Sequence, residues 1–462
     1  MRRRDFVAGS AGLLTALGGR AFAQPAGSDA DIERAIATMR ESDTHTQSLD
    51  LETSAAQAWL YGIMLIENAR TRAASLRVTP ANTLRHARML TTPASQGVTT
   101  PNNDTLYSTA WLDLTGGIVT LEVPRTGDRY ISYHFMDMYG NSFAIRGTRE
   151  DKGEAKSFRI IGPGGSRNGG DVIQSPTPWV WLLVRTLVDD AADLPAAHAV
   201  QDAIKLSGPP GPARPAPPEY ATRDAPWDQF FTSLQKLIVE NPPPRADDSF
   251  FPSIAALGLG RNGGFDAAKL AGSERVIQSG IDNAKAAASA QGAWGPVRGG
   301  WSYPQSNNGD FGTDYLFRAR IAIGGLAALK PVEAMYMRPI GPGGQAVLDS
   351  SKPWILRFTR EQLPPVNSFW SLTSYAQTPA GQFFFFPTPI NRYAIGDRTK
   401  GLRYGTDGSL EIVISRTNPG GTRAANWLPA PPMAPLGLFF RAYLPKPELL
   451  DGRYSLPALV QG

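Results

Sequence analysis

The chain of 462 residues contains no cysteine and only four histidines. The absence of cysteine excludes disulfides, thiolate nucleophiles, iron–sulfur clusters and cysteine-based zinc sites. Long hydrophobic runs are missing as well. No segment after residue 23 offers about 18 uninterrupted apolar residues, the length that spans a bilayer. We therefore expect the mature chain to have no stable membrane anchor.

An excess of one sign of charge is also lacking. The sequence has 46 Lys and Arg against 41 Asp and Glu, a formal net charge of +5. Residues 1–23 contain four arginines and one aspartate, so the rest of the chain carries only +2. Nucleic-acid binding needs a dense basic patch, and no such run follows. We expect no nucleic-acid partner.

What the sequence does contain begins with a segment typical of an export signal, MRRRDFVAGSAGLLTALGGRAFA at residues 1–23. Arginines precede a short apolar stretch, and AFA at 21–23 forms a cleavage signature with Ala23 and Gln24 on either side of the cut. The sequence RRDFV resembles the consensus of the twin-arginine route, which carries folded proteins. We expect the twin-arginine export machinery to deliver the chain to a bacterial periplasm. A general secretory leader or an anchored helix remains an alternative.

Glycine (47) and proline (39) are both abundant and follow no repeat, which suits short strands joined by many turns. The sequence predicts a mainly β fold with helical additions, α+β overall, built from two antiparallel β-sandwich or jelly-roll-like domains. The expected divisions are a signal peptide at 1–23, an N-terminal β-sandwich domain with a helical preface at 45–205, a proline-rich linker at 206–227, a helical insert at 228–330 and a C-terminal jelly-roll-like domain at 331–457.

Two carboxylates are the candidate acid/base groups. Asp104 lies in a turn-rich segment with Asn103 and Tyr107, and polar loop residues on a rigid scaffold often form sites. Asp137 ends a row of core-facing strand residues, so its carboxyl must find donors, leave the sheet or carry a raised pKa. His134 and Asp137 point to opposite faces of a regular strand, so a shared metal ion is not expected. Plain turn chemistry explains the same residue types.

The C-terminal half mixes aromatic rings with amides and arginine, a combination that suits a sugar-like or carboxylated ligand. The candidate binding residues there are Tyr375, Asn391, Arg392, Asn426 and Trp427. Aromatic packing inside a sheet domain is the alternative interpretation. We predict no cofactor, because the glycine pattern at 258–263 lacks the strand–helix context of a dinucleotide site. We predict no metal.

Several of these segments together resemble a family of bacterial proteins that pair two domains of unknown function, numbered 1254 (N-terminal) and 1214 (C-terminal). The motifs are WLYG at 59–62, PNNDTLYS at 101–108, WLDL at 111–114, RYISYHFMDMY at 129–139, FWSLTSY at 369–375, NRY at 391–393, YGTDGSL at 404–410 and NWLP at 426–429. The similarity covers roughly 45–190 and 315–455. It implies two β-sandwich domains, the second jelly-roll-like, and it brings no activity.

Three functions remain open. The first is a binding protein that holds a polar organic ligand where the two domains meet, a favoured place for ligands. The second is a periplasmic hydrolase or lyase in which Asp104 and Asp137 act as general acid and base. The third is an assembly protein that forms a closed homo-oligomer. Exposure of the four consecutive phenylalanines at 383–386 would favour the assembly function.

Overall fold

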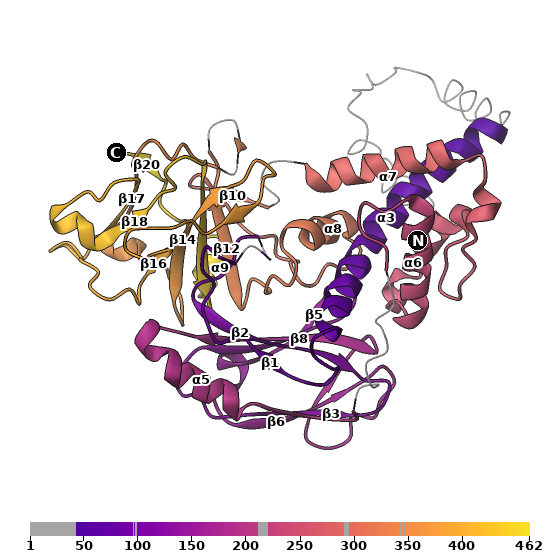
Figure 1. Cartoon of the computed structure of the whole chain (residues 1–462), viewed down its shortest axis with the longest axis horizontal. Coiled ribbons are helices and arrows are strands. Elements are labelled where there is room, and N and C mark those ends of the chain that lie inside the picture. The colour runs from indigo at the N-terminus through magenta and orange to yellow at the C-terminus, as the bar shows by residue number, and fades with distance from the viewer. Residues whose placement is uncertain are drawn as a thin grey trace.

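The computed structural model describes residues 43–462 apart from 96, 98, 211–219, 291–294, 342–343 and 346. The expected signal peptide, with Ala23 and Gln24, and the middle of the proline-rich linker lie outside the described residues. Figure 1 shows three units: a pair of sheets early in the chain, a second pair late in the chain, and a group of helices. The fold is mixed α/β, with four mostly antiparallel sheets and several helices.

The N-terminal sheet unit has two layers around one core. One layer has the order β1-β2-β8-β4-β5 and the other β7-β6-β3-β9. The strands are β1 (Arg85–His86), β2 (Thr105–Asp113), β3 (Val119–Val123), β4 (Ile131–Met136), β5 (Ser142–Gly147), β6 (Lys156–Ile161), β7 (Asp171–Gln174), β8 (Trp179–Leu187) and β9 (Lys205–Ser207). Alternate side chains of β2, β4 and β8 fill this core together with β3 and β6. The helices α4 (Thr148–Asp151) and α5 (Leu194–Ala203) lie at its margin.

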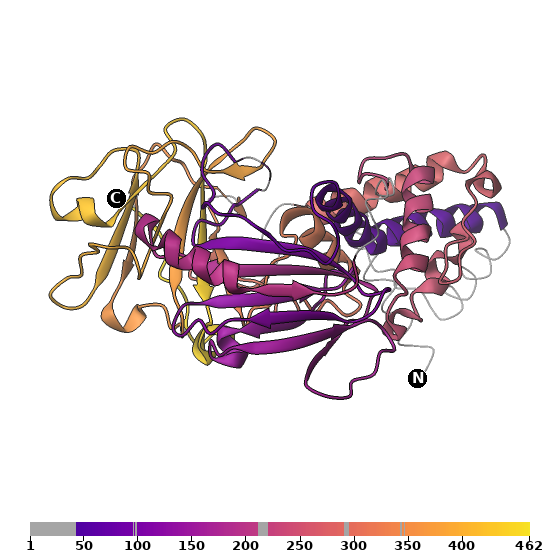
Figure 2. The ribbon, with the colours of Figure 1, turned by 60° about the horizontal axis from the view of Figure 1, so that its bottom comes forward.

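The opposite face of the five-stranded sheet is buried too. All six residues of β4 are buried, which explains why this strand reads as a nearly continuous apolar and aromatic run rather than a clean alternation. Figure 1 shows why: the C-terminal sheet unit and the helical unit both lie on this face, away from the layer that holds β3 and β6. Figure 2 shows the two units toward opposite ends of the sheet. The second face of this sheet therefore contributes to the contact between the units.

The C-terminal sheet unit also has two layers. A seven-stranded sheet has the order β10-β11-β12-β19-β14-β15, with β16 beside β14, and a four-stranded sheet has the order β18-β17-β13-β20. The strands are β10 (Val297–Arg298), β11 (Trp301–Ser302), β12 (Ala334–Pro339), β13 (Trp354–Phe358), β14 (Trp370–Gln377), β15 (Phe383–Phe384), β16 (Ala394–Gly396), β17 (Leu410–Ser415), β18 (Trp427–Pro429), β19 (Leu436–Tyr443) and β20 (Val460–Gln461). Both layers face one hydrophobic core, and the short helix α9 (Pro447–Leu450) contributes Leu449 to it.

The helical unit combines segments from distant parts of the chain: α3 (Asp43–Leu76), α6 (Trp227–Glu240), α7 (Glu274–Ser289) and α8 (Tyr315–Gly324). All four helices share one core. Helix α3, which precedes the N-terminal sheets in the chain, therefore packs with α6, α7 and α8. The strands β10 and β11 fall within the expected helical insert, but they pair with each other and with β12 of the C-terminal sheet. Among the described residues, no helix is both long and apolar enough to cross a membrane.

Candidate functional site

The N-terminal and C-terminal sheet units meet through a small core of their own. Tyr130 and Leu187 come from the N-terminal unit, and Phe369, Tyr443 and Ala334 come from the C-terminal unit. The Phe369 and Tyr443 rings stack with centroids 4.1 Å apart, and Tyr130 meets the Tyr443 ring edge-on at 5.2 Å. This packing fixes the two units relative to each other and so shapes the space beside it.

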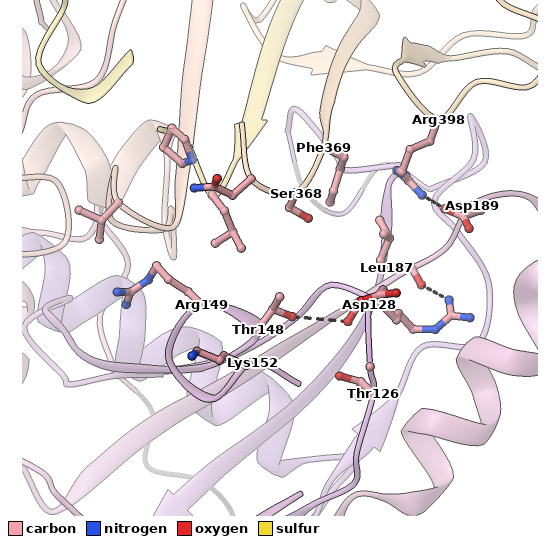
Figure 3. A pocket seen from close by; sticks show the side chains of 16 residues that line it. Thr126, Asp128, Thr148, Arg149, Lys152, Leu187, Asp189, Ser368, Phe369 and Arg398 are labelled. Carbon is pink, nitrogen blue, oxygen red and sulfur yellow. Dashed lines mark hydrogen bonds and ion pairs between the residues drawn. The ribbon is translucent and has the colours of Figure 1, made fainter. Parts of the chain in front are cut away.

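A cavity of about 990 Å³ lies next to this core, at the junction. Figure 3 shows that one wall comes from turns of the N-terminal unit and the other from loops of the C-terminal unit. The N-terminal wall comprises residues 126–129, 148–149, 152, 187 and 189. The C-terminal wall comprises residues 332, 367–369, 398 and 444–445. A cavity of this size can accommodate a small organic molecule.

Ion pairs fix most of the charges of the cavity wall. Arg398 pairs with Asp189 across the junction. Arg129 holds Asp193 through two hydrogen bonds of 2.6 Å, which lower the pKa of that carboxyl below its ordinary value. These residues act as preorganised dipoles, because each guanidinium group is already neutralised by a carboxylate.

A second interunit pair uses a carboxylate that is buried. Glu333 is 1% exposed and accepts hydrogen bonds from Arg149 Nε at 2.8 Å and from the Tyr130 hydroxyl at 2.9 Å. Burial raises the pKa of Glu333, and the bonds from Arg149 and Tyr130 partly oppose that rise. The Glu333 carboxylate therefore links the cavity wall to the core of the junction.

Lys152 is the cationic residue of the cavity wall for which the described residues provide no ion-pair partner. It follows α4 in a left-handed backbone conformation (φ 54°), and its backbone N–H bonds the Thr148 carbonyl at 3.1 Å. This conformation ends the helix and leaves the side chain exposed. Asn367, Ser368 and Thr126 add uncharged polar groups, and the buried Thr126 hydroxyl has no hydrogen-bond partner. The wall can thus bind an acidic group and several hydroxyls.

The loop residues expected to form a site lie deep in the junction and do not line this cavity. Asp104 is buried, and the Ser371 hydroxyl of β14 donates a hydrogen bond to its carboxylate at 2.8 Å. Asn103 is half-buried in the same turn. The ring of Tyr107 lies 5.4 Å from the guanidinium group of Arg185. The segment 101–108 therefore joins the two units.

Asp137 caps a turn at the end of β4. Its Oδ1 accepts hydrogen bonds from the backbone N–H groups of Tyr139 at 2.9 Å and Asn141 at 2.8 Å. Burial raises its pKa to about 6, as expected for a carboxyl that ends a core-facing row. The strand register separates it from Asp104: β2 begins opposite Leu187 of β8, and β4 ends opposite Trp181. Six residues of strand span about 20 Å, so these two carboxylates do not converge.

The candidate binding residues of the C-terminal half are also away from the cavity, and most of them hold the backbone. Tyr375 is fully buried and bonds the Pro101 carbonyl. Arg392 donates to the carbonyl groups of residues 425 and 427, and the Asn426 amide bridges the backbone of residues 403 and 411. The buried Trp427 donates its indole N–H to the Ser415 carbonyl at 2.9 Å. Asn391 is exposed with φ 50°.

The sequence did not point to Arg149 of α4, to Lys152 directly after it, or to Arg398 in the turn after β16. One signal was available, because Phe369 of the cavity wall begins the FWSLTSY motif at 369–375. The described residues contain no group of three His, Cys, Asp or Glu side chains arranged to hold a metal ion.

Comparisons with known proteins assign the two sheet units. Family models described as protein of unknown function match residues 81–208 (DUF1254) and 333–447 (DUF1214). No curated protein matches the sequence.

Two solved structures are similar. The VPA0106 protein from Vibrio parahaemolyticus aligns over 89% of this chain and 100% of its own, with a TM-score of 0.67 and 21% identity, which shows a shared fold. A putative uncharacterized protein from Burkholderia cenocepacia aligns over 92% of this chain and 98% of its own, with a TM-score of 0.44 and 12% identity. The chain belongs to the family in which a DUF1254 domain is followed by a DUF1214 domain.

Proposed function

We propose that this protein binds a polar, sugar-like small molecule that carries a carboxylate, in the cavity between its two sheet units. The observation that carries the proposal is the junction cavity of about 990 Å³. Its wall combines Lys152 and Asp128, neither of which has an ion-pair partner among the described residues, with ion pairs fixed in place and with uncharged polar groups. Clefts between domains commonly bind ligands in this way, with a few convergent polar groups that set orientation.

Each part of the wall has a role in this proposal. Lys152 binds the carboxylate of the ligand, because its ammonium group is not neutralised by a described side chain. Asn367 and Ser368 hydrogen-bond to ligand hydroxyls. Arg398 and its partner Asp189 come from different units, so a ligand that touches both walls also stabilises their contact.

We also propose that the two units are β-sandwiches and that the second is of the jelly-roll type. The strand order supports this assignment. The chain alternates between the layers from β12 to β13, β14 and β17, and then returns with β19 between β12 and β14. Crossing between two facing layers in this manner is the pattern of jelly rolls.

Export to a bacterial periplasm, through the twin-arginine machinery, is part of the proposal and rests on residues 1–23. No observation favours the other two functions over binding. Asp104 and Asp137 lie at opposite ends of their sheet, and the four phenylalanines at 383–386 are buried within the chain.

The test is a thermal-shift and calorimetric titration of the protein with galacturonate and gluconate, and with galactose as the uncharged comparison. Because a ligand that binds only the folded state must stabilise it, the sugar acids should raise the melting temperature in a saturable way. Lys152→Gln should weaken their binding about tenfold, the weight of one charge-assisted hydrogen bond. Added salt should weaken binding to the wild-type protein.

The matched control is Lys269→Gln, which removes an exposed charge from the helical unit. It should bind sugar acids as the wild type does. Binding that is equal in Lys152→Gln and Lys269→Gln, or a response to galactose alone, would contradict the proposal.

A further inference from the structure

Two arginines lie buried on facing sheets, deeper in the junction than the cavity. Arg185 of β8 is 4% exposed and lies opposite Tyr107 of β2 and Ser132 of β4 in the sheet register. Arg441 of β19 is 3% exposed and lies opposite Tyr336 of β12 and Ser371 of β14. Each sheet thus contributes one row in which an arginine is flanked by a tyrosine and a serine.

The partners of Arg185 within the described residues are all uncharged. Its Nη2 donates to the Ala327 carbonyl at 2.8 Å, its Nη1 lies 3.4 Å from Nδ1 of His134, and its guanidinium group lies over the Tyr107 ring. His134 does not supply a negative charge, and burial together with the nearby Arg185 lowers its pKa well below the ordinary value.

Arg441 is surrounded in the same way. It donates to the Thr373 hydroxyl at 2.7 Å, the Tyr375 hydroxyl at 2.8 Å and the Thr100 carbonyl at 3.1 Å. No carboxylate is among these partners. In both cases oxygen or ring dipoles orient a full positive charge without neutralising it.

No carboxylate among the described residues pairs directly with either arginine. Asp104 is buried on the same side of the junction and bonds to Ser371, and its charge acts on Arg441. The charges of Arg185 and Glu333 also act on each other, but Glu333 is bound by Arg149, which pairs with Glu150 as well. Two buried guanidinium groups therefore lack a direct ion pair, and a buried charge without one costs free energy.

A second observation marks the space beside the arginines. The Ser132 hydroxyl is fully buried in the row of Arg185 and makes no hydrogen bond of normal geometry, and the Tyr130 phenol is the side chain close enough to interact with it. Burial raises the pKa of the Tyr336 phenol, and the charges of Arg185 and Arg441 both lower it. Tyr336 therefore lies close to both arginines. Tyr336 and Tyr107 remain partly solvent-accessible at this otherwise closed centre.

We propose that these two facing rows form an anion site, separate from the junction cavity, that takes the oxyanion group of a small carboxylate or inorganic oxyanion. The anion forms the direct ion pairs that Arg185 and Arg441 lack among the described residues. The Ser132 and Tyr336 hydroxyls donate to its oxygens, so that four groups from two sheets converge on one ligand. Planar guanidinium groups suit such oxyanions because they present parallel donors.

The test uses the full chain with acetate and, separately, inorganic phosphate, in calorimetric titrations at constant ionic strength. Ser132→Ala removes one hydroxyl without adding bulk, and it should weaken anion binding about tenfold, the weight of one hydrogen bond to a charged group. Tyr336→Phe should do the same, and Arg185→Gln should abolish saturable binding. Preference for acetate identifies a carboxylate site, and preference for phosphate identifies an inorganic oxyanion site.

Lys152→Gln separates this site from the cavity. It should leave the binding of acetate or phosphate unchanged, whereas it weakens the binding of sugar acids. If Arg185→Gln does not fold, Ser132→Ala and Tyr336→Phe still decide the question. The proposal is overturned if these two variants bind as the wild type does, if Lys152→Gln alone abolishes binding, or if neither anion binds in a saturable way.

Crystals soaked in selenate can locate the bound anion independently, because selenium scatters anomalously. The expected result is a peak between the guanidinium groups of Arg185 and Arg441. Peaks found only at surface positions would show adventitious binding and overturn the proposal.

Discussion

At the scale of single residues, Asp137 shows how burial and turn chemistry act on one carboxyl. It is 2% exposed, and three donors from Tyr139 and Asn141 hold it. Desolvation outweighs these bonds and raises its pKa from 3.8 to about 6. The folded state therefore binds this proton more tightly than the unfolded state. The resulting stabilisation is full below pH 3.8 and is lost as the pH rises through 6.

Asp137→Asn should remove this pH dependence. Asparagine keeps a carbonyl oxygen for the two backbone donors, and it has no charge to desolvate. Relative to the wild type, the free energy of unfolding of the variant should rise by about 2.5 kcal/mol between about pH 4 and about pH 7.5. Urea denaturation at both pH values measures this difference.

The exposed Asp282 of α7 supplies the control, and Asp282→Asn should follow the wild type at both pH values. An Asp137→Asn protein with the pH profile of the wild type would show that its carboxyl titrates normally. Such a result would remove the physical basis for treating Asp137 as a perturbed group.

At the scale of elements, the crossing of α3 and α7 depends on one glycine. A Cβ added at Gly280 would lie 2.1 Å from the Glu52 carbonyl oxygen and 3.1 Å from the Ala55 Cβ. The backbone of α3 thus lies against α7, and a methyl group can be accommodated only if the two helices move apart.

Gly280→Ala should therefore destabilise the protein by about 1–3 kcal/mol, although alanine favours a helix by about 1 kcal/mol in an exposed position. The midpoint of urea denaturation reports the change. Ser289→Ala on the exposed end of the same helix should stay within about 0.5 kcal/mol of the wild type. A stabilised Gly280→Ala protein would mean that the helices do not cross this closely.

The sequence was informative about individual elements. The run at 129–137 contains β4, and the run that begins at Trp179 is β8, because branched and aromatic residues bounded by turn residues favour strands. It was less informative about which elements pack together. Ala56, Trp59, Leu60 and Ile63 recur at helical spacing and so predict that one face of α3 is buried, but the same pattern would suit a sheet or a helix bundle as its partner.

At the scale of the whole molecule, the junction core makes the two sheet units interdependent. Phe369 is 1% exposed and packs on Tyr443 of its own unit and on Tyr130 of the other. Because residues of both units fill this core, we expect the wild-type protein to unfold in one calorimetric transition.

Phe369→Ala should lower the stability by about 3–5 kcal/mol and move the whole transition. Phe358→Ala, in the core of the C-terminal unit and away from the junction, is the matched comparison and should move the same single transition. Two separate transitions, only one of which responds to Phe358→Ala, would show that the units unfold independently.

The candidate site could not be predicted from the sequence, because its position depends on how the whole molecule packs. Lys152 and Arg398 are far apart in sequence and lie in turns whose composition suggests only exposure. Their approach depends on how two separately folded cores meet. Asn426 and Trp427 carry the residue types of a binding site, but hydrogen bonds to their own backbone surroundings use their polar groups. Composition shows that such groups are available, whereas only the packed structure shows what they bind.

The shared core of α3 with α6, α7 and α8 has a consequence for synthesis on the ribosome. Helix α3 leaves the exit tunnel early, and its set of helical partners is complete only when the chain has been made past Gly324. The sheets of the N-terminal unit are complete at Ser207, so they can form before α3 is covered. The apolar face of this helix must therefore stay in solution, or be shielded by a chaperone, for much of translation.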